Sequence, residues 1–326
     1  MRRRTWTAVA GLFGVLALGG CSGGGQDGGQ GGGAAPTGGA AGGTYAVITH
    51  AAAGDSFWDV VKNGAEAAGA RYGVTVGYQG DGDPARQAQL IDQAVSRRVD
   101  GIVVSMANPD ALREPVGKAV AAGIPVITIN SGAERSREFG AITHVGQSEE
   151  VAGRGAGEKL GAEGVTKLLC VIHEAGNVGL DQRCVGASRG LGGTVERLQV
   201  DVRNLADATS KIMARLQADT ALDGVLTLNP AVAAAARDAI ADSGSRARLA
   251  TFDLSADVVA AVRDGEILFA VDQQQYLQGW LPITFLHLHR TNLNTVGGGL
   301  PVNTGPGFVT RETAAQVARL AENGTR

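Results

Sequence analysis

The sequence lacks several patterns that mark metal-binding, redox and nucleic-acid-binding proteins. Its only cysteines are Cys21, Cys170 and Cys184, and none forms a Cys-x-x-Cys pair, so neither a zinc site nor a thioredoxin-type motif is indicated. Basic side chains are not in excess. Subtracting the three arginines of residues 2–4 from 29 basic side chains, against 32 acidic ones, leaves a net charge of about −6. With no basic stripe and no helix-turn-helix before the first strand, nucleic acid is not an expected partner.

A long hydrophobic run occurs only at the start of the chain. Residues 1–20 combine three arginines with an apolar stretch that is short for a transmembrane helix, which predicts a signal peptide. The stretch ends Leu-Gly-Gly-Cys and resembles the lipobox of bacterial lipoproteins, so Cys21 is the expected lipidation site. The alternative is an ordinary secretory peptide with a chance cysteine.

Residues 21–43 form a glycine-rich linker. Twelve of the twenty-two residues from Ser22 to Gly43 are glycine, and such a segment has little to bury. A signal peptide, an anchor cysteine and a linker together predict a protein held at the outer face of the cell membrane, with the bilayer contacted only through the anchor.

The first structured unit is expected at Tyr45–Gly73. A short apolar run typical of a buried strand leads through a polar turn into an amphipathic helix that Asp55 or Ser56 could cap. The turn does not have the glycines of G-x-G-x-x-G, which argues against a phosphate-binding turn. It holds Asp55, Phe57 and Trp58, which suit a small polar ligand with an apolar face. Packing of the helix onto a sheet is the alternative role of both aromatics.

Strands and helices then alternate along the rest of the chain, which predicts parallel sheets with right-handed crossovers. Further strands are expected at 74–78, 100–105, 124–129, 141–145, 167–173, 198–202, 223–228, 249–252 and 267–271. Helices are expected at 84–97, 109–122, 149–161, 181–195, 207–216, 230–242, 256–263, 276–289 and 311–322, and 291–308 reads as loop or crossover. Close helix packing is the expected role of Gly153, Gly155 and Gly157.

The joint order of several pieces resembles the type I periplasmic binding proteins, in the ribose and hexose branch of ABC-transporter substrate-binding proteins. The pieces are Asp55-Ser56-Phe57-Trp58, DGIVVSMANPDAL at 100–112 and GIPVITIN at 123–130, together with the lipoprotein signal. The resemblance covers about residues 45–321. It implies an α/β fold of two Rossmann-like lobes joined by three crossings. Lobe 1 would comprise residues 44–146 plus about 274–303, and lobe 2 residues 147–273 plus about 304–326.

Ligands of open α/β sheets bind at the carboxyl ends of strands, and polar residues are predicted there. Each of three residues ends a second-lobe strand, where the resemblance implies hydroxyl-binding groups: Asn229, Asp253 and Gln273. The alternative is that Asn229 merely caps a helix and that Asp253 merely forms a turn. Arg183 matches the family arginine that clamps a ring oxygen or hydroxyl. Substitution of Arg183 or Asp253 is expected to spare folding, since both are expected at loop ends.

The resemblance implies a further set of ligand-binding residues. His50 is a weaker candidate, and Asp181 and Gln182 resemble a pair in the autoinducer-2 receptor of the same superfamily. Ribose binders have an Asp-Arg pair where this chain has Asn130 and Ser131. The neutral Asn130 is therefore a candidate contact for a ligand other than ribose.

The two remaining cysteines are expected to pair outside the cytoplasm. Cys170 lies on a predicted strand and Cys184 on a predicted helix, and these elements flank one loop. A disulfide between them is the hypothesis, and a buried free thiol at Cys170 is the alternative.

These observations predict a lipid-anchored receptor that hands a sugar or polyol to an ABC permease. The alternative is a signalling receptor for an autoinducer-2-like ligand. An enzyme is not expected, because no catalytic His–Asp–Ser set can be placed, and no metal or cofactor is expected.

Overall fold

The computed structural model describes residues 42–52 and 54–326. The predicted signal peptide, Cys21 and most of the linker lie outside these residues. Within the described part of the chain, no helix is both long and apolar enough to cross a membrane.

Two six-stranded sheets form the framework of the fold. The first sheet has the order β11-β5-β4-β3-β1-β2 and the second the order β12-β10-β9-β8-β6-β7. The first comprises β1 Thr44–Thr49, β2 Thr75–Gly80, β3 Gly101–Ser105, β4 Val126–Ile129, β5 Thr143–Gly146 and β11 Val302–Asn303. The second comprises β6 Lys167–Ile172, β7 Thr194–Gln199, β8 Gly224–Thr227, β9 Arg248–Phe252, β10 Phe269–Asp272 and β12 Gly307–Thr310. The predicted fold class is confirmed: both sheets are parallel except for the antiparallel pair β10–β12.

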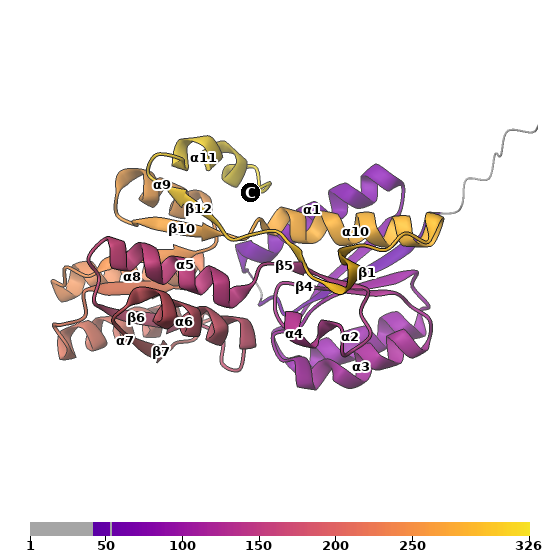
Figure 1. Cartoon of the computed structure of the whole chain (residues 1–326), viewed down its shortest axis with the longest axis horizontal. Helices are drawn as coiled ribbons and strands as arrows, with labels where there is room; N and C mark the ends of the chain where they lie inside the picture. Colours follow the sequence, from indigo (N-terminus) through magenta and orange to yellow (C-terminus); the bar gives the residue numbers. More distant parts are fainter. Residues whose placement is uncertain (1–41, 53) are drawn as a thin grey trace, which may run out of the picture. The chain divides into compact units, whose positions relative to one another are not determined.

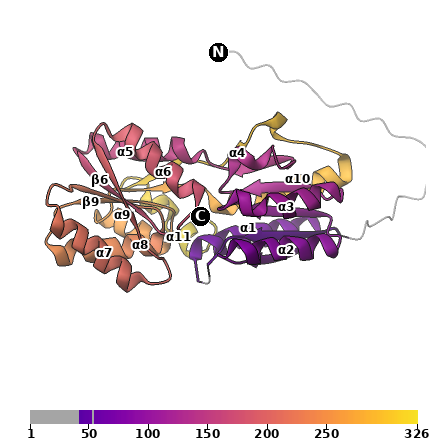
Figure 2. The ribbon, with the colours of Figure 1, turned by 90° about the horizontal axis from the view of Figure 1, so that it is seen from below.

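Helices cover both faces of each sheet, because strands such as β3 (GIVVS) are buried along their whole length. The helices are α1 Ser56–Tyr72, α2 Pro84–Ser96, α3 Pro109–Ala121, α4 Ala133–Ser136, α5 Glu149–Ala162, α6 Val178–Leu191, α7 Leu205–Ala218, α8 Pro230–Ser243, α9 Ala256–Asp264, α10 Gln275–Asn292 and α11 Ala314–Glu322. On the first sheet α1 and α10 lie on one face and α2 and α3 on the other (Figure 1). On the second, α5 and α6 lie opposite α7 and α8 (Figure 2).

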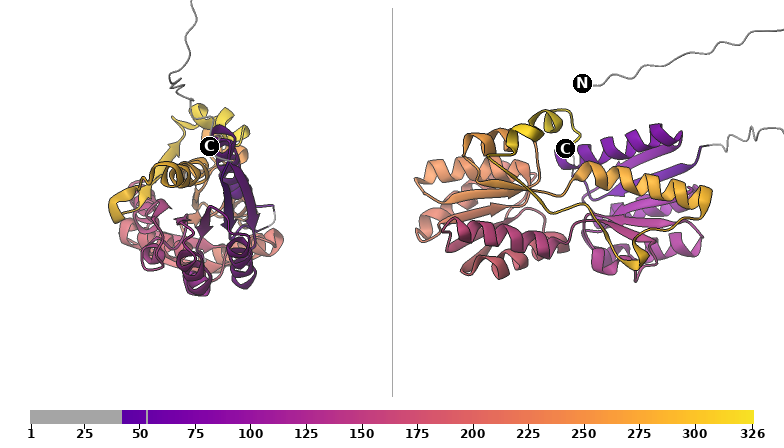
Figure 3. Two further views of the ribbon diagram at one scale, coloured as in Figure 1. Left: turned by 90° about the vertical axis from the view of Figure 1, so that its right-hand side faces the viewer. Right: turned by 45° about the horizontal axis from the view of Figure 1, so that its top comes forward.

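The chain passes between the sheets three times, after β5, after β10 and between β11 and β12. The second passage leads into α10, which runs beside α1 (Figure 3). A Cβ at Gly279 would lie 1.9 Å from the carbonyl oxygen of Val61, and one at Gly64 would lie 2.1 Å from that of Tyr276. Glycine at these two positions therefore allows the two backbones to approach.

The prediction for residues 181–202 is wrong at the element boundaries. The helix predicted at 181–195 is α6, which ends at Leu191, and the strand predicted at 198–202 is β7, which begins at Thr194. The cause is Gly192, which caps the helix in the left-handed region with φ of 70°.

The segment 291–308, predicted to be loop or crossover, contains β11 and the start of β12. Each adds an edge strand to a different sheet, so the segment is the third passage between the sheets.

The disulfide hypothesis is confirmed in the structure, where Cys170 of β6 is bonded to Cys184 of α6. Both cysteines are buried, and the bond fastens α6 to β6, the strand next to the edge strand β7 of the second sheet.

Candidate functional site

Equivalent positions in the two sheets supply the polar residues of the site. His50 directly follows β1, and His173 directly follows its counterpart β6. Asn130 follows β4 and Asp253 follows β9, and both adopt positive φ, 62° and 71°. Asn and Asp tolerate this region better than most residues, so the same unusual backbone conformation occurs at equivalent strand ends of both sheets.

These residues line a small pocket between side chains of the two sheets, with a cavity volume of about 20 Å³. Nine of the eleven predicted ligand-binding residues line it: His50, Asp55, Phe57, Trp58, Asn130, Arg183, Asn229, Asp253 and Gln273. Six further lining residues were not predicted: Ser131, His173, Glu174, Asn177, Leu180 and Leu228.

Asp181 and Gln182 are not among the residues that line the pocket. Asp181 lies on the outer side of α6, where its half-exposed carboxylate is 3.3 Å from Nη1 of Arg197. The same helix contains Gly186-Ala-Ser-Arg-Gly190, which matches the pattern G-x-S-x-G. Ser188 is exposed within this helix rather than on a strand-to-helix turn, so the match is not a nucleophile elbow.

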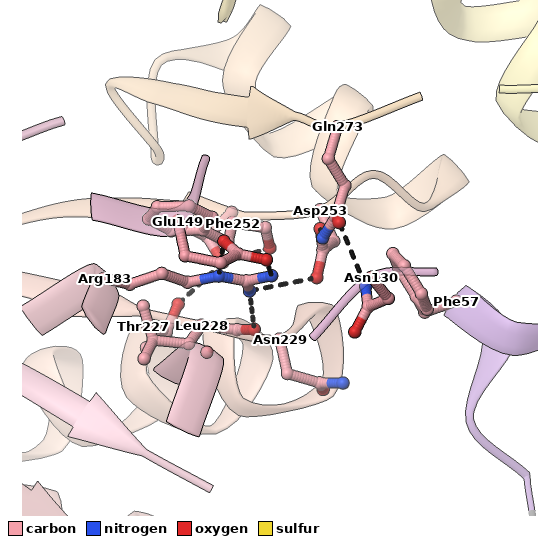
Figure 4. Close-up of polar contacts among 12 residues, drawn as sticks. Phe57, Asn130, Glu149, Arg183, Thr227, Leu228, Asn229, Phe252, Asp253 and Gln273 are labelled. Atoms are coloured by element: carbon pink, nitrogen blue, oxygen red, sulfur yellow. Dashed lines mark hydrogen bonds and ion pairs between the residues drawn. The ribbon is translucent and has the colours of Figure 1, made fainter. Parts of the chain in front are cut away.

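Arg183 lies within α6 and is buried, so the expectation that it occupies a loop end is wrong. Its Nε is 2.7 Å and its Nη2 is 3.0 Å from the two carboxylate oxygens of Glu149. Its Nη1 lies 3.4 Å from the carbonyl oxygen of Leu228 and 3.8 Å from Oδ2 of Asp253 (Figure 4). Burial opposes the charge of Arg183, but Glu149 and Asp253 outweigh it and raise the pKa of the guanidinium.

A chain of hydrogen bonds links Asp253 to the first lobe. Nε2 of Gln273 donates to Oδ1 of Asp253 at 2.6 Å, and Nδ2 of Asn130 donates to Oε1 of Gln273 at 3.1 Å (Figure 4). Burial raises the pKa of Asp253 to about 7, although Arg183 and Gln273 oppose the rise. The site therefore holds a carboxyl group that can donate or accept near neutral pH.

Nδ2 of Asn229 in the second lobe donates to Oδ2 of Asp55 in the first lobe at 3.4 Å. Each also caps a helix. Oδ1 of Asp55 accepts from the backbone N–H of Phe57 in α1, and Oδ1 of Asn229 accepts from that of Ala231 in α8. The cap alternative for Asn229 is thus real, but its Nδ2 still faces the pocket. Burial raises the pKa of Asp55 to about 6.

A second contact between the lobes joins His50 and Glu174. Nε2 of His50 is 3.8 Å from Oε2 of Glu174, while Nδ1 of His50 is 2.7 Å from Oγ of Ser105. Burial lowers the pKa of His50, and it lowers that of His173 to about 4, so both rings are neutral at pH 7. Burial favours protonation of Glu174, but the charges that His50 and His173 acquire in acid, a hydrogen bond from Asn177 and the charge of Arg183 together hold its pKa below the usual value.

The apolar wall of the pocket is formed by Phe57 and Trp58. Their ring centroids are 4.9 Å apart in an edge arrangement, and Trp58 meets the ring of His50 in the same way at 4.7 Å. Both aromatics are nearly buried and also pack in the core of the first lobe. Phe57 and Trp58 therefore both pack in the core and line the pocket.

Two sequence signals could have identified some of the missed residues. His173 and Glu174 follow a predicted strand, as His50 does, and Asn177 stands where a helix begins. Glu149 gave no such signal, because its partner Arg183 is 34 residues away. Among the described residues, no group of three or more His, Cys, Asp or Glu side chains is placed to hold a metal ion.

Comparisons with known proteins agree on one family. A family model described as a periplasmic binding protein domain matches residues 45–291. A carbohydrate transporter from Acidothermus cellulolyticus 11B, solved with myo-inositol, is 41% identical with a TM-score of 0.86, over 87% of this chain and 100% of that one. An ABC transporter solute-binding protein from Agrobacterium vitis, solved with D-fucose, is 26% identical with a TM-score of 0.75, over 86% and 99%.

Two curated relatives match over shorter stretches. The ribose import binding protein of Bacillus subtilis is 27% identical over 207 residues, or 61% of this chain. The xylose/arabinose-binding protein of Sulfolobus acidocaldarius is 22% identical over 238 residues, or 68% of this chain. The matches span 66% and 59% of the length of these two relatives.

Proposed function

Because the chain belongs to the periplasmic binding protein domain family, we propose that it is an extracytoplasmic receptor for a sugar or cyclic polyol, which it delivers to an ABC permease. The lobes close on the ligand and present it to the transporter. The family consists of solute-binding proteins, and no enzymatic reaction is proposed.

The chemistry of the pocket is the main support for this proposal. Carboxyl groups of Asp55 and Asp253 accept from hydroxyls, Arg183 donates, and the amides of Asn130 and Asn229 do both. Phe57 and Trp58 supply an apolar wall for the C–H face of a ring. A polyhydroxylated ring needs both kinds of partner at once.

Two observations narrow the choice of ligand. Asn130 and Ser131 replace the Asp-Arg pair of ribose binders, which disfavours ribose. The relative at 41% identity was solved with myo-inositol, so a saturated ring with hydroxyls on every carbon is the first candidate. Asp181 and Gln182, on which the likeness to an autoinducer-2 receptor rested, lie outside the pocket, so solute import is favoured over signalling.

A thermal-shift panel tests the ligand class. The exported chain carrying Cys21→Ala is measured with myo-inositol, D-fucose, D-ribose, D-xylose and inorganic phosphate. A ligand at a hundred times its Kd is expected to stabilise the native state by about 2.7 kcal/mol. The proposal fails if no sugar or polyol raises the melting temperature while phosphate does.

We further propose that the chain is anchored by a lipid on Cys21, on the basis of Leu-Gly-Gly-Cys at 18–21 and the glycine-rich linker. The native chain is expected in the membrane fraction after a high-salt wash, and Cys21→Ala is expected in the soluble fraction. Unchanged membrane retention of Cys21→Ala would contradict lipid anchoring.

A further inference from the structure

The ion pair of Glu149 and Arg183 compensates the charge of the guanidinium at the pocket. The two residues make two parallel hydrogen bonds, at 2.7 and 3.0 Å, and their side chains are 3% and 4% exposed. A buried, bidentate pair of this kind is among the stronger polar contacts in proteins. Arg183 therefore meets a ligand with its charge already compensated.

Neighbouring groups hold the pair in one orientation. Nε2 of Gln147, from the passage after β5, donates to Oε2 of Glu149 at 2.9 Å. The ring of Phe252 lies under the guanidinium, with its centroid 4.6 Å from Cζ of Arg183. Figure 4 shows the guanidinium extending toward Asp253 with Glu149 alongside it. Only Nη1 of Arg183 is left without a carboxylate oxygen at hydrogen-bond distance.

The remaining charged groups of the pocket are acidic. Asp55, Glu174 and Asp253 line it, and Arg183 is the one Lys or Arg among the described lining residues. His50 and His173 add no positive charge at pH 7. With Glu149 present, no cation in this lining is available to balance an anionic ligand.

We propose that Glu149 is a specificity-determining residue that restricts the site to uncharged sugars and polyols and excludes uronates and polyol phosphates. It does so by occupying two donor groups of Arg183 and cancelling its charge. This inference rests on the proposed function. Without Glu149, the guanidinium would keep only the longer ion pair with Asp253, whose Oδ2 lies 3.8 Å from Nη1, and the site would lose one negative charge.

The test compares a neutral ligand with anions in Glu149→Gln. Calorimetry at pH 8 measures Kd for the best neutral binder of the panel, for D-glucuronate, and for inorganic sulfate, which is too small to be excluded by shape. Glu150→Gln is the matched control, because Glu150 is a half-exposed neighbour on the same helix that pairs with Arg189. In Glu149→Gln, affinity for both anions relative to the neutral ligand is expected to rise at least about tenfold. Bringing like charges together in a buried site weakens binding by more than a factor of ten in Kd, and this variant removes one negative charge.

Unfolding curves show whether Glu149→Gln is folded. If it is not, Glu149→Asp replaces it. This variant keeps the charge, shortens the side chain, and is expected to reject anions as the native chain does. An unchanged ratio in Glu149→Gln, or equal binding of anion and neutral ligand by Glu149→Asp or the native chain, overturns the proposal. Failure of the proposed function is separate, because it appears as the absence of any neutral ligand for the native chain.

Discussion

At Asp253, burial favours the protonated carboxyl group, while the neighbouring Arg183 and Gln273 favour the charged carboxylate. The residue is 4% exposed, and burial raises the pKa of its carboxyl group from 3.8 to about 7. Positive φ at this position is compatible with Asp or Asn and with few other side chains. Asn is therefore the substitution that preserves both the backbone conformation and the acceptor for Gln273 while removing the titratable carboxyl group.

We expect Asp253→Asn to change how stability depends on pH. Between pH 4 and 7 the unfolded chain releases the proton of Asp253 and the folded chain retains it, so native stability falls as pH rises through this window. The difference between 3.8 and about 7 corresponds to roughly 4 kcal/mol at most. Urea unfolding at several pH values should show that the free energy of unfolding of Asp253→Asn falls less between pH 4 and 7 than that of the native chain.

The comparison of native and variant chains isolates Asp253. Asp55, whose pKa is about 6, contributes a decline of the same sign in both proteins and cancels in the difference. Parallel stability curves for the two proteins across pH 4–7 would show that Asp253 titrates normally in the fold.

At the scale of elements, the packing of α5 against α6 determines where Arg183 lies. A Cβ at Gly157 would be 2.3 Å from the carbonyl oxygen of Ala187, and one at Gly153 would be 2.1 Å from that of Arg183 itself. The close helix packing predicted for Gly153 and Gly157 is confirmed, whereas Gly155 faces the ring of Phe308 in β12. The Cys170–Cys184 bond holds α6 from the sheet side, so the helix is fixed on two sides.

We expect Gly157→Ala to destabilise the fold by about 1–3 kcal/mol, because the two helices must separate to admit the methyl group. Displacement of α6 should also weaken polyol binding through Arg183. Denaturant unfolding and calorimetry measure the two effects.

Gly117→Ala is the matched control. Gly117 lies in α3, where an added Cβ has no neighbour within 4 Å. This substitution is expected to leave binding unchanged and to stabilise the helix by roughly 0.5–1 kcal/mol. If both variants had the same stability, the close approach of α5 and α6 would not constrain the fold.

At the scale of the whole molecule, the two lobes are in direct contact around the pocket. Asp55 meets Asn229, His50 meets Glu174, and the backbone N–H of Val178 donates to the carbonyl oxygen of Ala107 at 3.0 Å. The polar groups lining the pocket are largely buried by these contacts. A ligand must therefore enter when the lobes are apart.

We expect the ligand-free protein in solution to have a larger radius of gyration than the protein saturated with its neutral ligand. Bending at the three passages between the sheets would allow this change. X-ray scattering at matched concentrations, with and without the best binder of the panel, measures it. Identical scattering curves would mean that the ligand enters without lobe separation.

The sequence alone determined the α/β class, the two repeated lobes and the strand ends where the pocket-lining residues gather. These features follow from local patterns: apolar runs, caps and turns that alternate along the chain. Asn229, Asp253 and Gln273 could be predicted because each directly follows an apolar strand. The error at 181–202 was also local, since Gly192 was available as a helix stop.

Only the tertiary structure decided which of these side chains meet. The pairing of Glu149 with Arg183, the contact of Asp55 with Asn229, and the edge strands β11 and β12 join residues far apart in the sequence. Asp181 and Arg183 differ by two positions, yet one points to solvent and the other to the pocket, because positions two apart on a helix face different directions. Such contacts depend on how whole elements pack, which no local pattern records.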